Sequence, residues 1–155
     1  MERRTFLKTG GLLLAGAALP GALQAAAESH LIYLSPLKSN GQLSRCQAEV
    51  WFVQDGADMY VVTANNAWRA RAIAQGLQQT QVWVGDVGQW QSSDGRYKNL
   101  PNMTASGEQI DDVQTHARLL DIFGRKYADE WGSWGPRFKR GLADGSRVLL
   151  RYSPA

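Results

Sequence analysis

The stretch that decides the fold runs from Cys46 to Gly76 and reads "CQAEVWFVQDGADMYVVTANNAWRARAIAQG". Two runs of β-branched and aromatic residues flank Asp55 and Gly56, a pattern typical of a hairpin with a short loop. After Thr63, alanine, arginine and isoleucine recur at helical spacing as far as Gly76, a residue type at which helices commonly end. The stretch therefore predicts a β-hairpin followed by a short helix.

Outside this stretch, further runs predict strands. The segment "HLIYL" at 30–34 predicts a first strand, and "SRVLLRY" at 146–152 predicts a last one. The segment "QVWVGDVGQW" at 81–90 alternates, with Val82 and Val84 on one face, and its glycines suggest a bulge or bend. The turn "SSDG" that follows predicts that "RYKNL" at 96–100 returns as another strand.

A long helix is expected before the last strand. Ser106 and Gln109 match a capping box, and two aspartates follow in what would be the first turn. An apolar stripe then continues to residue 131, where "WGSWGP" is expected to end the helix in a loop that covers a barrel edge or lines a subunit interface. The expected core residues of this stripe are Val113, Ala117, Leu120, Phe123, Tyr127 and Trp131. We therefore predict an α+β domain dominated by an antiparallel sheet of five or six strands, closed as a small barrel, with one short and one long helix.

The N-terminal segment resembles a twin-arginine signal peptide. Arg3 and Arg4 precede "TFLK", an apolar run follows at 10–19, and small residues stand at 25–27. The apolar run is too short and too rich in glycine for an anchor, because a spanning helix needs about 20 apolar residues. We expect residues 1–27 to be a leader, removed after Ala27, and residues 28–155 to form a single domain carried to the periplasm by the twin-arginine translocase.

The charge balance changes once the leader is set aside. It holds three of the 17 basic and one of the 14 acidic residues, so residues 28–155 carry 14 basic and 13 acidic side chains. Phosphate neutralisation needs a larger basic surplus, so we expect no nucleic-acid partner, and no stable membrane insertion either. Cys46 is the single cysteine, which excludes an internal disulfide and argues against zinc. Its strand-like surroundings predict a small buried hydrophobe rather than a nucleophile.

The segments "WFVQDGADMYVV" and "MYVVTANNAWRARAIAQG", with "RKY" at 125–127, resemble the split-barrel flavoproteins typified by pyridoxamine 5'-phosphate oxidase. The resemblance covers most of residues 28–155. It implies a split β-barrel, a homodimer, and flavin mononucleotide (FMN) as cofactor, with a deazaflavin or no cofactor as alternatives. It also implies which residues would form the cofactor site: Lys38, Ser39, Arg45, Thr63, Trp68, Arg69 and Arg71.

The roles of these candidate residues have alternative interpretations. Arg69 and Arg71 are two positions apart, so they do not share a helical face unless the helix begins between them, and Lys38 could be a solvated charge. Trp68 could stack on a flavin ring or fill its place. The physical reason for the arginines is that a guanidinium grips two phosphate oxygens at once.

We assign no catalytic residue and no metal ligand. His30 is expected to be exposed, His116 to be partly buried on a helix, and Glu49 to face the wet side of the sheet. Because flavin chemistry belongs largely to the cofactor, a flavin-dependent oxidoreductase of unknown substrate remains the leading expectation. The alternative is a periplasmic binding or structural protein that keeps the barrel without a cofactor.

Overall fold

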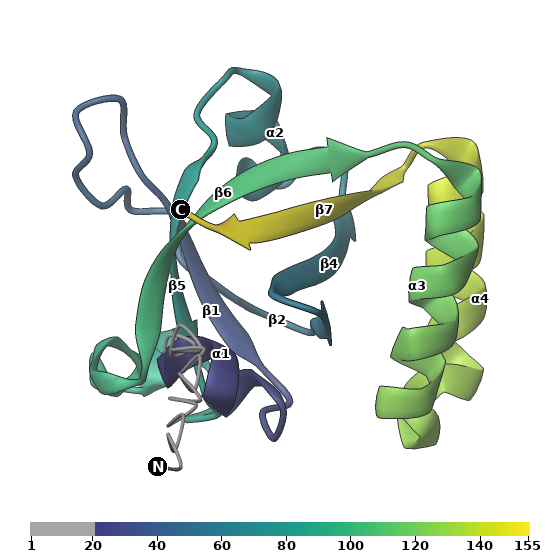
Figure 1. The fold of residues 1–155 in the computed structure, drawn as a ribbon, viewed down its shortest axis with the longest axis horizontal. Helices are drawn as coiled ribbons and strands as arrows, with labels where there is room; N and C mark the ends of the chain where they lie inside the picture. Colours follow the sequence, from purple (N-terminus) through teal and green to yellow (C-terminus); the bar gives the residue numbers. More distant parts are fainter. Residues whose placement is uncertain (1–20) are drawn as a thin grey trace, which may run out of the picture.

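The computed structural model describes residues 21–155, which form one curled antiparallel sheet with helices at its ends and on one side (Figure 1). The order of the seven strands is β2-β1-β5-β6-β7-β4-β3. The strands are β1 (Ile32–Pro36), β2 (Ala48–Val50), β3 (Val53–Asp55), β4 (Asp58–Ala64), β5 (Gln79–Val84), β6 (Asn102–Ile110) and β7 (Arg147–Pro154). The helices are α1 (Gly21–Ala26), α2 (Trp68–Ala74), α3 (Val113–Lys126) and α4 (Ala128–Asp144), with 3₁₀ turns η1 (Trp90–Ser92) and η2 (Arg96–Asn99). The predicted fold class is confirmed.

The hairpin and short helix predicted from the deciding stretch are both present. β3 pairs with β4 so that Asp55 lies opposite Asp58, and Gly56 between them takes a φ of +63°, which favours glycine. β2 precedes this hairpin as an additional short strand. After α2, Gly76 turns the chain with a φ of +87°.

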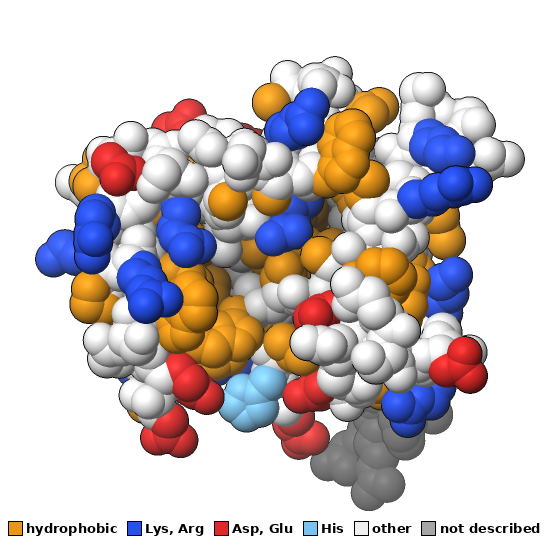
Figure 2. Space-filling model, turned by 180° about the vertical axis from the view of Figure 1, so that it is seen from behind, with side chains coloured by type: hydrophobic (Ala, Val, Ile, Leu, Met, Phe, Trp, Pro, Cys, Tyr) orange, Lys and Arg blue, Asp and Glu red, His pale blue; other side chains and the backbone are white. Residues whose placement is uncertain are grey.

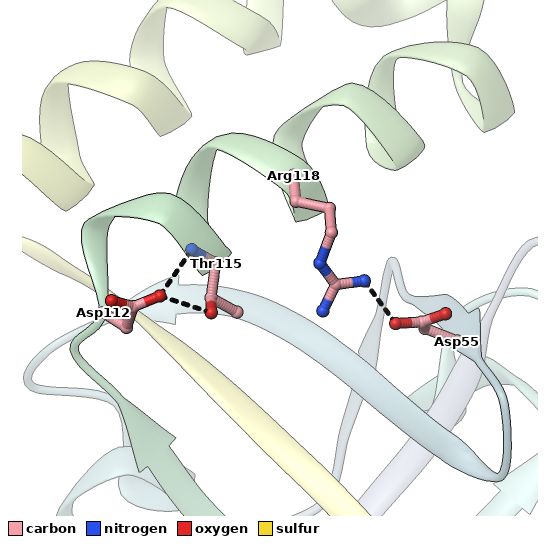
Figure 3. Close-up of polar contacts among 4 residues, drawn as sticks. All are labelled: Asp55, Asp112, Thr115 and Arg118. Carbon is pink, nitrogen blue, oxygen red and sulfur yellow. Dashed lines mark hydrogen bonds and ion pairs between the residues drawn. The ribbon is translucent and has the colours of Figure 1, made fainter.

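The expected capping box at Ser106 and Gln109 is wrong, because both residues lie within β6. The helix instead begins after Asp112, whose carboxylate accepts a hydrogen bond of 2.8 Å from the Thr115 amide and one of 2.6 Å from its hydroxyl (Figure 3). The pairing of β6 with β5 and β7 outweighs the local capping pattern of Ser106 and Gln109.

The long helix is in fact two helices, α3 and α4, that pack as a hairpin (Figure 1). The segment "WGSWGP" lies inside α4 instead of forming a loop. Its glycines allow close packing: a Cβ at Gly135 would come within 2.8 Å of the Trp131 ring, and one at Gly124 on α3 would too. The predicted loop over a barrel edge is therefore replaced by a helix.

The predicted strand "RYKNL" is also wrong, because residues 96–99 form the 3₁₀ turn η2. Its one buried side chain, Tyr97, stacks on Tyr33 with ring centroids 5.3 Å apart and meets Trp83 edge-on. The turn thus closes a small aromatic cluster on the outside of β1 and β5 and does not extend the sheet.

The sheet separates two larger apolar clusters. Along β4, Met59 and Val61 point into the curl, whereas Tyr60 and Val62 point toward α3 and α4. An exposed ion pair between Arg118 and Asp55 also joins α3 to the hairpin (Figure 3). Phe123 and Tyr127 of the predicted stripe belong to the cluster on the side of α3 and α4. Val113, which was also predicted to be core, is 76% exposed.

The leader motif at Arg3 and Arg4 lies outside the described residues. The last part of the expected leader is described, and residues 21–26 form α1. Within residues 21–155, no helix combines the length and apolar character needed to cross a bilayer.

Candidate functional site

A pocket of about 320 Å³ lies between α2 and the loop that follows β1. Its floor is apolar, and three of the predicted site residues lie on its wall: Lys38, Arg45 and Trp68. The remaining lining residues are Pro36, Leu37, Ser44, Cys46, Ala72 and Leu77. Three residues predicted from the sequence, two cations of a loop and one aromatic residue of a helix, thus lie around one cavity.

Trp68 is the first residue of α2, and Ala72, one turn later, is buried. The indole remains 50% exposed. The Arg71 guanidinium carbon lies 4.9 Å from the centre of the Trp68 ring, a cation–π arrangement that places a second charge at the pocket edge. Arg71 is itself exposed.

Ser39 does not line this pocket. It lies with Lys38 beside a neighbouring hollow of about 290 Å³, formed with residues 76–79 at the turn after α2. Leu37, Lys38 and Leu77 line both cavities, and Lys38 is the predicted site residue among them.

Thr63 and Arg69 are not among the residues that line either cavity. Thr63 is 2% exposed, and its hydroxyl has no partner. The Arg69 Nε is buried without a partner, as is the hydroxyl of Tyr152. The seven predicted residues therefore divide into an outer group of five at or beside the two cavities, the buried Thr63 and the half-buried Arg69.

Burial lowers the pKa of Arg69, and the nearby Tyr152 phenol opposes that shift. Burial likewise raises the pKa of Tyr152, with Arg69 acting in the opposite direction. An arginine is so basic that it keeps its proton at neutral pH even when desolvated. Arg69 is therefore a partly buried cation, and within residues 21–155 it has no carboxylate within ion-pair distance.

The prediction for Cys46 is wrong in detail. The residue lies in the loop before β2, not in a strand, and is half-buried on the pocket wall. Its amide donates to the Ser44 hydroxyl over 3.3 Å.

Comparison with known structures identifies this architecture. HutZ, the heme storage protein from Vibrio cholerae, has a TM-score of 0.59 and 15% identity, covering 85% of this chain and 86% of HutZ. The fold is a split β-barrel. A Listeria innocua protein provisionally named a pyridoxamine 5'-phosphate oxidase has a TM-score of 0.53 and 12% identity over 85% of this chain and 89% of its own. An FAD-binding protein from Mesorhizobium loti gives 0.53 and 13% over 86% and 87%.

At these identities the comparisons establish the split barrel alone. No protein-family model matches the sequence, and no curated protein matches it either.

The split barrel also carries an aromatic pocket that sequence reasoning missed. It has a volume of about 290 Å³ and is lined by Val50, Trp51, Val62, Trp134, Phe138 and Arg147. The Arg147 guanidinium carbon lies 5.2 Å from the Phe138 ring centre. One face of the molecule is hollowed, with hydrophobic side chains in the hollow, Lys and Arg side chains above it and to its left, and Asp, Glu and His side chains below it (Figure 2). The four-residue spacing of Trp134 and Phe138 could have revealed the pocket, had residues 131–136 been read as helix.

The remaining candidates have structural partners. His30 is exposed as predicted, and His116 is half-buried with its Nε2 2.7 Å from the Ile110 carbonyl oxygen, also as predicted. Glu49 does not face open solvent: it is half-buried, and its carboxylate accepts a hydrogen bond of 3.1 Å from the Trp90 amide.

Proposed function

We propose that the chain is an exported split-barrel protein that binds FMN. The observation that carries the proposal is Arg69, a half-buried charge whose Nε is buried without a partner and which has no acidic partner among residues 21–155. A buried cation without a counter-charge is costly, and an anionic ligand would supply the missing partner. A phosphate suits it, because a guanidinium can bind two phosphate oxygens in parallel.

The surroundings of Arg69 support the same ligand class. Trp68, its neighbour in the chain, presents half of its indole to solvent beside an apolar pocket with two more cations, Lys38 and Arg45. A planar ring can stack on an indole while its phosphate meets a guanidinium. FMN carries both groups; a deazaflavin with a phosphate would satisfy the same side chains.

The names of two structural neighbours support a planar ligand that carries acidic groups. One is an FAD-binding protein, and the other is a heme storage protein. We propose a flavin-dependent oxidoreductase of unknown substrate. Bound FMN would supply hydride transfer, and this chain's residues would bind and orient it. The second candidate, a binding or structural protein without a cofactor, is favoured by the fully buried and unpartnered hydroxyl of Tyr152 near Arg69, which shows that this region tolerates unsatisfied groups.

Titration with FMN and with riboflavin, which lacks the phosphate, tests the site. Arg69→Met should weaken FMN binding about ten- to a hundredfold, the value of one charge-assisted contact, and leave riboflavin binding unchanged. Arg125→Met, at an exposed position of α3, is the matched control and should change neither. If the unaltered protein binds neither ligand at high micromolar concentration, the barrel without a cofactor becomes the better account.

Export and assembly have their own tests. Replacing Arg3 and Arg4 by lysine should hold the chain in the cytoplasm, because the translocase reads the arginine pair.

We further propose a homodimer with an isologous interface. Light scattering should report twice the mass of the chain in the presence of FMN, and a monomer under those conditions would contradict the dimer.

A further inference from the structure

Helix α1 is a buried part of the barrel. Ala22, Leu23 and Ala26 are only 1%, 3% and 1% exposed, and they belong to the apolar cluster inside the curled sheet. Figure 1 shows α1 at one end of the curl, where it contacts β5 and β6. The helix therefore closes that end of the barrel.

The helix is also held by polar contacts. The Gln54 side-chain amide donates to the Leu23 carbonyl oxygen over 3.4 Å, and the Glu28 amide donates to the Ala25 carbonyl oxygen over 3.3 Å. The first contact connects α1 to β3, on the other side of the barrel end. The second turns the chain out of the helix toward β1.

The same residues form the end of the expected leader. The small residues at 25–27 mark the predicted cut after Ala27. Ala27 and Glu28 are both exposed, although Ala26 beside them is buried. The bond to be cut is thus accessible while the helix before it occupies the barrel.

We propose that α1 closes the barrel only in the uncut chain, and that the cut after Ala27 opens this end as a binding site for an uncharged aliphatic group. This inference rests on the proposed export and adds a site to it. The cut removes Leu23, Ala22 and Ala26 from an apolar cluster, together with Ala25, which packs against it. Apolar space left by lost side chains destabilises a protein and accepts apolar molecules of similar size.

The two forms would suit the two compartments. The uncut chain is a closed barrel with its inner cluster complete, which is the form a carrier of folded proteins would move. The cut chain would be open, and so would acquire its aliphatic ligand only after export. FMN would be bound at the α2 side, independently of this end.

The test compares the uncut and the cut form of the protein. The uncut chain is purified from the cytoplasm with Arg3→Lys and Arg4→Lys, and the cut chain is purified from the periplasm, its first residue confirmed as Glu28. Both are titrated with the apolar dye 1-anilinonaphthalene-8-sulfonate. We expect the cut chain to bind the dye at least tenfold more tightly, 1-octanol to displace it, and the midpoint of thermal unfolding to fall by about 10 °C.

Variants of the uncut chain separate opening from other effects of the cut. Leu23→Asp should expel α1 and give dye binding like that of the cut chain, and the milder Leu23→Ala should give an intermediate result. Ala27→Asp, at an exposed position of the same segment, should bind no more dye than the parent.

Equal dye binding by both forms, or by Leu23→Asp and Ala27→Asp, would overturn the proposal. An exported chain that still begins at or before Gly21 would overturn it too, yet would leave export standing. Normal export of the double-lysine chain would instead overturn the twin-arginine route.

Discussion

The Tyr127 hydroxyl lies 2.8 Å from the Phe52 carbonyl oxygen and 3.0 Å from the Phe52 amide nitrogen, so one side chain satisfies both polar groups of a residue 75 positions away. The same hydroxyl is 2.8 Å from the His30 carbonyl oxygen. Phe52 belongs to the short connection between β2 and β3, and Tyr127 lies at the junction of α3 and α4. This contact therefore holds the α3–α4 hairpin against the connection between β2 and β3.

Tyr127→Phe should lower the free energy of unfolding by about 1–3 kcal/mol, because it leaves the buried Phe52 amide without an acceptor while the ring stays in place. Urea unfolding measures the change. Tyr97→Phe is the control, since Tyr97 is equally buried but its hydroxyl makes no hydrogen bond in the described structure. Equal losses in the two variants would contradict the assigned role of the Tyr127 hydroxyl.

Gly107→Ala should destabilise the protein by about 1–3 kcal/mol through overpacking. A Cβ at this position would lie 2.7 Å from Ile73 Cδ1 and 3.0 Å from Tyr152 Cε1. Adding Ile73→Val removes the nearest atom and should restore part of the loss, as a double-mutant cycle would measure. Gly132→Ala, within α4 and with open space around it, should instead stabilise by about 0.5–1 kcal/mol.

Lys126 makes the stability depend on pH. Its ammonium donates to the Phe52 carbonyl oxygen at 2.9 Å and lies 3.5 Å from the Phe52 ring centre, and burial lowers the pKa of Lys126 to about 8. Between about pH 8 and pH 10 the folded chain has lost this proton while the unfolded chain keeps it. The free energy of unfolding should therefore rise with pH in this window.

The rise should amount to about 1–2 kcal/mol after allowance for the partial exposure of the group, and Lys126→Met should abolish it. Urea unfolding at both ends of the window measures the slope. Lys139→Met, at an exposed position of α4, reports the effect of removing a surface charge alone. The window ends near pH 10, because burial raises the pKa of Tyr127 and of Tyr152 and folding then opposes their ionisation.

Asp112→Ala should remove the cap of α3 and lower the midpoint of thermal unfolding by about 3–5 °C at neutral pH. Hydrogen bonds from the Thr115 hydroxyl and amide lower the pKa of Asp112. The stabilisation is therefore present above the ordinary aspartate pKa and is lost as the pH falls through the lower, folded value. The parent and the variant should unfold at the same temperature in strong acid; a difference that persists there would exclude the cap as its cause.

The sequence predicted best where short-range chemistry decides the structure. The hairpin around Gly56 and the end of α2 at Gly76 both depend on positive φ angles that favour glycine, and both were found. Val82 and Val84 were placed on one face by alternation alone, and both are buried in the inner cluster.

The failures share a physical cause, which is contact between distant segments. Ser106 has a capping pattern around it, yet its strand neighbours Gln79 and Ser153 set its conformation. Gly132 and Gly135 suggest a break locally, whereas the Trp131 ring packed over Gly135 makes a small residue necessary inside a helix.

The candidate site shows the same limit. Spacing and resemblance selected cations and an aromatic residue near α2, and the structure places Lys38, Arg45 and Trp68 at one pocket. Spacing gave no sign that Arg69 would be half-buried near Tyr152, a residue more than 80 positions later in the chain. Such a pairing depends on β7 and β6, whose positions no local pattern specifies.

β7 is the last strand in chain order within residues 21–155, yet it lies in the interior of the sheet between β6 and β4. Until residues 147–154 leave the ribosome, no backbone hydrogen bond of the sheet joins β4 and β3 to the other four strands. A nascent or truncated chain is therefore two unconnected sheet fragments, each with an open edge. A chain that stops short of Arg147 therefore cannot form the closed sheet, because a single strand joins its two halves.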